Sequence, residues 1–332
     1  MKIRKIIKNE PPGALNCTGQ QNQRMITSLS AARAIAPGQY QSLEGSAHKN
    51  QMKRTLIDYL IKTGVILSGL GLMAHGAEQA DAASASDGWI GAGGHPTLQT
   101  NFPPEQGFFS KELDFHGLPI KANEVVSDAA MYEAHRRLSL MFTNLLSEQP
   151  QLLSNLITAG VELHIIGQHQ ATSDLPEFRD LKGKPLKEYN GLTIDQRTRG
   201  MGGRLTSCGE ENLLKLPGDR YPGRDICAHE FSHAIRNYGM PAEVVEKFDR
   251  QYRNSLARGL WRGAYSASNA DEFFAELTMW YFGTHGDLNM TGPRPKNGRE
   301  GLQEYDPEAY ALFDDFYRGR IHITKLDAGG HR

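Results

Sequence analysis

Cysteine is scarce in this chain, and neither sign of charge is in excess. Only 3 of its 332 residues are cysteine, which is too few for a small scaffold held together by disulfides. The 37 Lys and Arg residues balance 38 Asp and Glu residues and leave a formal net charge of -1. A near-neutral chain has no overall electrostatic attraction to nucleic acid, so we expect no nucleic-acid partner.

Long hydrophobic runs are also scarce, which excludes a membrane protein with several spans. The one candidate combines the basic residues Lys53 and Arg54 with an apolar run over 64–74. Charged residues interrupt the run on its N-terminal side, so it is too short to span a bilayer comfortably. With the small residues at 80–82, this pattern predicts a signal peptide over 52–82 and a secreted or periplasmic protein without stable membrane insertion. A membrane anchor or a buried helix is the alternative.

The signal divides the chain into segments. Residues 1–51 are polar, and we interpret them as an upstream extension, disordered or not translated, with Met52 as the true start. Cleavage after Ala82 would leave 332 − 82 = 250 residues, enough to bury a substantial core. Residues 83–110 are rich in Gly, Ser and Pro and are expected to form an extended lead-in, followed by a folded domain over 111–332.

Helix caps and apolar spacing predict an α+β fold. Ser127 and Asp128 cap a helix of about 20 residues. Alternating apolar residues over Val161–Ile166 predict a half-buried strand. Further helices are predicted between Pro150 and Gly160 and over 225–238, 241–259, 268–283 and 306–319.

The helix predicted over 225–238 contains the segment His229-Glu230-Phe231-Ser232-His233. Two histidines four residues apart lie one above the other on a helix face, so both rings can bind one Zn²⁺. Glu230 can then reach a water molecule at the open coordination position and act as general base. The alternative is a helix with two ordinary surface histidines, because short motifs also arise by chance.

A catalytic zinc needs a third protein ligand, and the helix predicted over 268–283 offers candidates. Glu272 and Glu276 are four residues apart and therefore share a helix face. One can bind the metal while the other accepts the free ring N–H of a ligand histidine and fixes its tautomer. Taken alone, the same pattern also fits a capped amphipathic helix with solvated carboxylates.

Together these motifs resemble the catalytic domain of the anthrax lethal factor-type zinc metallopeptidases, which are gluzincins. The resemblance rests on the histidine motif followed by Tyr265, Asn269 and Glu272-Phe273-Phe274-Ala275-Glu276, and it covers roughly residues 221–285. The large toxin's receptor-binding and translocation regions have no room in this chain, so delivery into a host cell and the toxin's substrate do not carry over.

The resemblance implies a zincin-like metallopeptidase domain, mostly helical with a small sheet. It implies zinc bound by His229, His233 and Glu272. It also implies Glu230 as general base, Tyr265 as the residue that assists at the tetrahedral intermediate, and Glu276 as the supporting carboxylate. The expected function is a secreted or periplasmic endopeptidase acting on a peptide or protein. The alternatives are a non-catalytic secreted zinc-binding protein on the same scaffold and a zinc hydrolase of a non-peptide amide.

Two further features bear on the site. Cys208 and Cys227 would remain after signal cleavage and are expected to pair in an oxidising compartment; the alternative is Cys208 as a thiolate ligand that blocks the zinc. The predicted strand Val161–Ile166 is a candidate edge strand to which an extended peptide could pair.

Several basic and histidine side chains are weaker candidates for the cleft. The loop residues Arg197, Arg199 and Arg204 could hold a substrate carboxylate, although a solvated loop is the simpler interpretation. The histidines His164, His169 and His285 could line the cleft or be structural.

Overall fold

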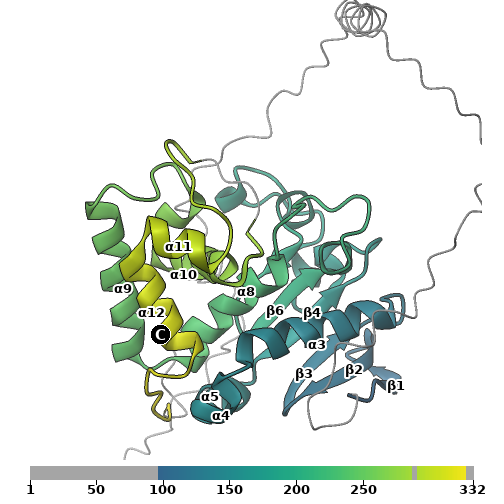
Figure 1. Ribbon diagram of the computed structural model, residues 1–332. Coiled ribbons are helices and arrows are strands. Elements are labelled where there is room, and N and C mark those ends of the chain that lie inside the picture. Colours follow the sequence, from purple (N-terminus) through teal and green to yellow (C-terminus); the bar gives the residue numbers. More distant parts are fainter. Residues whose placement is uncertain (1–95, 286–289, 327–332) are drawn as a thin grey trace, which may run out of the picture. The chain divides into compact units, whose positions relative to one another are not determined.

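Six strands form one mixed sheet in residues 96–285 and 290–326, which this computed structural model describes (Figure 1). Their order across the sheet is β1-β2-β3-β4-β6-β5. The strands are β1 (Gln99–Glu105), β2 (Phe109–Phe115), β3 (Leu118–Ala122), β4 (Glu162–Ile166), β5 (Gly200–Met201) and β6 (Leu205–Gly209). The pairs β3–β4 and β4–β6 are parallel, and the other three pairs are antiparallel.

The prediction that Val161–Ile166 is an edge strand is wrong. This segment forms β4, which pairs with β3 on one side and with β6 on the other. The alternation of apolar residues indicates which face of the strand is buried. It does not indicate which strands pair with it, because those strands come from distant parts of the chain. The sheet ends instead at β1 and at the two-residue strand β5.

Helices cover one face of the sheet and extend beyond it. They are α3 (Asp128–Phe142), α4 (Leu145–Glu148), α5 (Pro150–Thr158), α6 (Ile194–Arg197), α7 (Glu210–Leu213), α8 (Ile226–Ala234), α9 (Ala242–Ala257), α10 (Ala270–Phe282), α11 (Arg299–Tyr305) and α12 (Pro307–Tyr317). Short turns of helix are η2 (Thr172–Asp174), η3 (Pro176–Leu181), η4 (Lys187–Tyr189), η5 (Ile235–Gly239) and η6 (Tyr265–Ala267). Figure 1 shows α8 between the sheet and the group formed by α9 to α12.

The mixed sheet and the helices are compatible with the predicted α+β class, and several predicted helix ends are confirmed. The Ser127 side chain accepts a hydrogen bond from Ala130 N at the start of α3, and Gly283 ends α10 with φ of 71°. The helix expected to run about 20 residues from Ser127 has 15 residues and ends at Phe142. Strands over 99–122 were not predicted, and the first of them lies inside the expected lead-in. The predicted signal peptide and upstream extension lie outside the described residues.

Two hydrophobic clusters pack on the sheet. Along β4, Leu163 and Ile165 belong to the large core shared with the helices. Ile166 belongs to a smaller cluster with Phe178 of η3 and Met201 of β5. Because neighbouring strand residues point to opposite faces, the segment from η2 to α6 covers the face that the long helices leave open.

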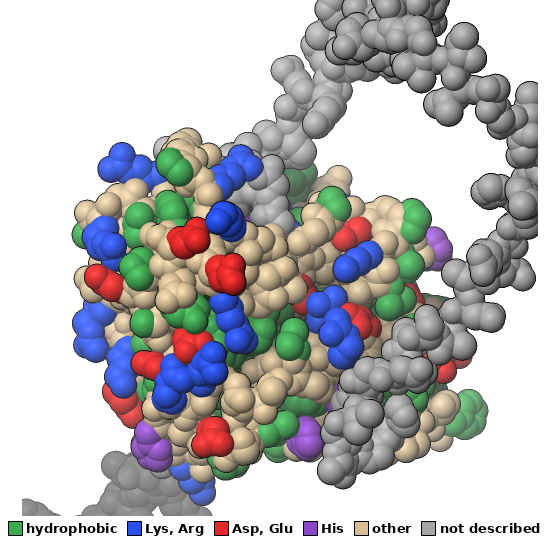
Figure 2. Space-filling view, viewed as in Figure 1, with side chains coloured by type: hydrophobic (Ala, Val, Ile, Leu, Met, Phe, Trp, Pro, Cys, Tyr) green, Lys and Arg blue, Asp and Glu red, His purple; other side chains and the backbone are tan. Residues whose placement is uncertain are grey.

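The described surface carries charges of both signs. On the face seen in Figure 2, Lys and Arg side chains are interspersed with Asp and Glu side chains. None of the helices within the described ranges is long and apolar enough to pass through a membrane.

A buried charge cluster lies under the smaller hydrophobic cluster. His164 on β4 is 1% exposed, and its ring nitrogens contact Glu177 Oε1 at 2.6 Å and Glu162 Oε2 at 3.0 Å. Lys121 Nζ on β3 contacts Glu162 Oε2 at 2.9 Å. Burial opposes the charge of His164, but the two carboxylates outweigh it and raise the pKa of the ring. Burial also opposes ionisation of Glu162, but His164 and Lys121 lower its pKa to about 2.

This cluster predicts a defined pH dependence of stability. The contribution of His164 is full below its ordinary pKa of 6.5 and is lost as the pH rises through the raised value in the folded state. The contribution of Glu162 is full above 4.5 and is lost as the pH falls toward 2. We expect His164→Gln to lower the free energy of unfolding by about 3 kcal/mol near pH 5.5, and by less in alkaline solution, because it breaks a buried ion pair.

Urea unfolding near pH 5.5 and in alkaline solution measures this loss of stability. His322→Gln is the control, because His322 is exposed. An equal loss of stability at both pH values would show that His164 acts through packing alone.

Candidate metal centre

Helix α8 begins beside the sheet and is fixed at its first turn. Asp225 caps it by accepting a hydrogen bond from Ala228 N at 3.0 Å, and Arg137 of α3 pairs with the same carboxylate at 3.1 Å. The predicted disulfide between Cys208 of β6 and Cys227 of α8 is present, with Cα atoms 5.0 Å apart. A cysteine in a disulfide has no free thiolate, so the alternative of Cys208 as a metal ligand is wrong.

Helix α10 brings Glu272 to the two histidines of α8. Glu272 Oε2 lies 3.2 Å from His229 Nε2 and 3.7 Å from His233 Nε2. One ligand atom from each residue fits within 4.8 Å of the others. His229 and Glu272 are buried, whereas His233 is half-buried, so the group opens toward solvent on one side. The three residues predicted to bind metal are therefore brought together.

A bound metal ion would satisfy these three side chains better than hydrogen bonds among themselves do. Glu272 Oε2 is buried and accepts no aligned hydrogen bond from the described residues, although two imidazole nitrogens lie beside it. A buried carboxylate oxygen left in this way is costly, and a cation at the same position would satisfy it. Two imidazoles and a carboxylate are a ligand set that catalytic Zn²⁺ uses.

The charge state of His229 supports the same interpretation. Burial disfavours a charged ring, but Glu272 and Glu276 outweigh it and raise the pKa of His229 to about 10. The two carboxylates therefore favour a positive charge at this position, and a bound cation would supply it with the ring in its neutral form.

Glu276 lies beside the ring nitrogen of His229 that does not face Glu272. Glu276 Oε1 lies 3.1 Å from His229 Nδ1, and Oε2 lies 2.6 Å from His285 Nε2. Arg224 forms a short ion pair with the same carboxylate. Burial opposes its ionisation, but Arg224, His229 and His285 outweigh burial and lower the pKa of Glu276.

The role of His285 was open from the sequence, and Arg224 was not predicted. His285 follows the Gly283 that ends α10, and its ring stacks on Trp280 with centroids 4.4 Å apart. Neither His285 nor Arg224 belongs to a periodic pattern or a motif, so no local signal in the sequence distinguished them. Of the other histidines, His164 lies in the buried charge cluster and His169 is exposed.

Glu230 and Tyr265 lie beside the group. Glu230 is half-buried, and burial raises the pKa of its carboxyl although His229 and His233 partly offset the effect. The Tyr265 ring, in η6, stacks beside that of His229 with centroids 6.3 Å apart. Burial and the charge of Glu272 raise the pKa of Tyr265 well above 10, so its hydroxyl stays protonated at neutral pH.

The edge strand β5 lies directly against α8. A Cβ atom on Gly200 would be 2.9 Å from Glu230 Cγ, and a Cβ on Gly202 would be 2.7 Å from the Cβ of His233. Glycine is therefore needed at both positions for the strand to approach the helix this closely. One of the two edges of the sheet, at β5, therefore lies beside Glu230 and His233.

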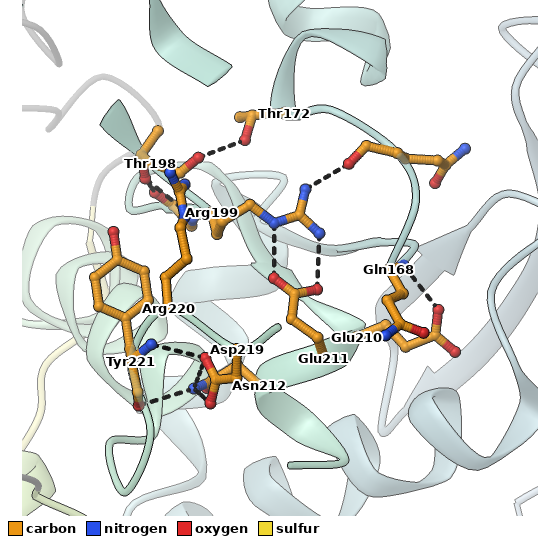
Figure 3. Close-up of polar contacts among 12 residues, drawn as sticks. Gln168, Thr172, Thr198, Arg199, Glu210, Glu211, Asn212, Asp219, Arg220 and Tyr221 are labelled. Atoms are coloured by element: carbon orange, nitrogen blue, oxygen red, sulfur yellow. Dashed lines mark hydrogen bonds and ion pairs between the residues drawn. The ribbon is translucent and has the colours of Figure 1, made fainter. Parts of the chain in front are cut away.

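Polar contacts of Arg199 fix the loop that carries β5 (Figure 3). Arg199 forms a two-point ion pair with Glu211 of α7, with both nitrogen–oxygen distances 2.7 Å. Its guanidinium also donates to the carbonyl oxygens of Gln170 and Gly167. Arg199 is therefore part of the scaffold and is neither a solvated side chain nor free to bind a substrate.

Neither a family model nor a curated protein matches this chain. The interpretation of the site therefore rests on the geometry of its own residues.

The supporting role of Glu276 can be tested through metal affinity. Glu276→Gln removes the negative charge that orients His229, and we expect the affinity for Zn²⁺ to fall about 10- to 100-fold. Competition with a chromophoric chelator measures the change. Glu304→Gln is the control, because Glu304 is exposed and its nearest cation is the exposed Lys296 at 3.5 Å. Equal affinities of wild type and Glu276→Gln would rule out the supporting role.

Proposed function

We propose that this chain is a zinc-dependent endopeptidase with a zincin-like domain, related in its site to the anthrax lethal factor-type peptidases. The observation that carries the proposal is the convergence of His229, His233 and Glu272 from two helices, with Glu230 and Tyr265 beside them. The resemblance to the lethal factor-type family implies the same five residues in the same roles.

Each residue has a task that its position supports. His229, His233 and Glu272 would hold the zinc, which when bound polarises a peptide carbonyl and makes a coordinated water more acidic. Glu230 would take a proton from the attacking water and deliver it to the leaving amine. Burial raises the pKa of its carboxyl, which makes it a stronger proton acceptor. The protonated Tyr265 hydroxyl would donate a hydrogen bond to the developing oxyanion.

A peptide substrate is favoured by the unpaired edge of β5. This strand pairs with β6 on one side, and no strand of the described residues pairs with its other side. An extended peptide can add to such an edge through main-chain hydrogen bonds. Because Gly200 and Gly202 lie against Glu230 and His233, a peptide added there would lie beside the general base.

The proposed location is outside the cytosol, either secreted or periplasmic. The predicted signal over 52–82 motivates it. The Cys208–Cys227 disulfide is consistent with it, because disulfides persist in oxidising compartments.

The general base gives the direct test of this proposal. Glu230→Gln keeps the shape of the side chain but cannot accept the proton. We expect the zinc content of the variant to equal that of wild type, while hydrolysis of a generic unfolded protein falls about a hundredfold or more. Metal analysis and a peptide-release assay measure the two quantities.

The alternatives predict different results. Wild type that holds one zinc and cleaves no peptide bond would favour the non-catalytic zinc-binding protein. Hydrolysis of small non-peptide amides alone would favour a zinc hydrolase of a non-peptide amide. Equal cleavage by wild type and Glu230→Gln would remove Glu230 from the mechanism.

A further inference from the structure

Arg197 stands at the end of a rigid turn that leads into β5. The turn α6 is closed by Thr193, whose side chain accepts a hydrogen bond from Gln196 N. Asp195 accepts hydrogen bonds from Ser173 N and Ser173 Oγ, both at 2.8 Å. Arg220 donates to Gln196 O at 3.0 Å. The backbone that carries Arg197 is therefore fixed from three sides before any ligand binds.

The guanidinium of Arg197 has no ion-pair or hydrogen-bond partner among the described residues, although it is half-buried. The other arginines around the site differ. Arg199 pairs with Glu211, Arg224 with Glu276, and Arg236 of η5 with Asp249 and Asp271. A half-buried cation loses hydration, and a carboxylate from outside would compensate for that loss.

Arg197 lies three residues before Gly200 in the chain, and a Cβ atom on Gly200 would be 2.9 Å from Glu230 Cγ. The turn that carries Arg197 therefore leads directly to the strand that lies against the proposed general base. The charge of Arg197 also opposes the rise in pKa that burial causes in Glu230 of α8, Tyr265 of η6 and Tyr189 of η4. A peptide that pairs with the free edge of β5 would pass this turn.

We propose that Arg197 is a specificity residue that binds a carboxylate of the peptide substrate, close to the bond that is cleaved. The inference rests on the proposed peptidase function, which it refines to substrates with an acidic group at one position. The carboxylate has two sources, an Asp or Glu side chain or the free C-terminus of the peptide.

The position of Arg197 links the source to the direction of the peptide. Arg197 precedes Gly200, at the N-terminal end of β5. A peptide antiparallel to β5 presents its C-terminal half to Arg197, and a parallel peptide presents its N-terminal half. A free C-terminus can reach the guanidinium only in the antiparallel arrangement.

Binding measured without cleavage tests the inference separately from the proposed function. The zinc-loaded Glu230→Gln protein is titrated with short fluorescent peptides that carry one Glu or one Gln at each position in turn. Each peptide is prepared with a free and with an amidated C-terminus. Removing the charge of Glu230 also excludes an effect of Arg197 that acts through that carboxylate.

We expect one Glu peptide to bind about tenfold more tightly than the matching Gln peptide, or the free C-terminus to bind about tenfold more tightly than the amidated one. This is the typical effect of one charge-assisted contact. Adding Arg197→Gln to the Glu230→Gln protein should abolish this preference for a carboxylate. Adding Arg197→Lys instead should keep part of the preference because the charge remains. The control is Arg204→Gln, which removes a half-buried arginine beyond the other end of β5 and should keep the full preference.

The outcomes separate the two proposals. No preference for a carboxylate, no peptide binding, or a preference that survives Arg197→Gln overturns the role of Arg197. A preference that depends on Arg197 supports it even if wild type proves unable to cleave peptide bonds, in which case the peptidase proposal alone fails.

Discussion

The site depends on one electrostatic constraint, the burial of Glu272 beside the imidazoles of His229 and His233. Each of these polar groups is costly to remove from water, and they are placed where a single cation could satisfy all three. The neighbouring elements serve this arrangement. The disulfide and the Asp225 cap fix α8, and Glu276 holds His229 by its second nitrogen.

The second constraint is steric and concerns β5. Gly200 and Gly202 allow a sheet edge to lie against the helix that carries the general base and one of the histidines. The ion pair of Arg199 with Glu211 then fixes the same loop from behind. The edge therefore lies beside the base and His233, and the chain that leads into it carries Arg197.

Much of the candidate site was predictable because its geometry is local. Residues four apart on a helix share a face, so the spacing of His229 with His233 and of Glu272 with Glu276 placed each pair correctly. Helix caps such as Ser127 were predictable for the same reason. The neighbours of β4 were not, because strand pairing joins segments far apart in sequence. The strand β5 has two residues, too few for any periodic signal.

X-ray absorption at the zinc edge of the purified protein tests the central claim most directly. We predict two imidazole nitrogens at about 2.0–2.1 Å with oxygen ligands and no sulfur, and loss of this spectrum in Glu272→Ala. A coordination shell that contains sulfur, or one that is unchanged in Glu272→Ala, would contradict a site built from His229, His233 and Glu272.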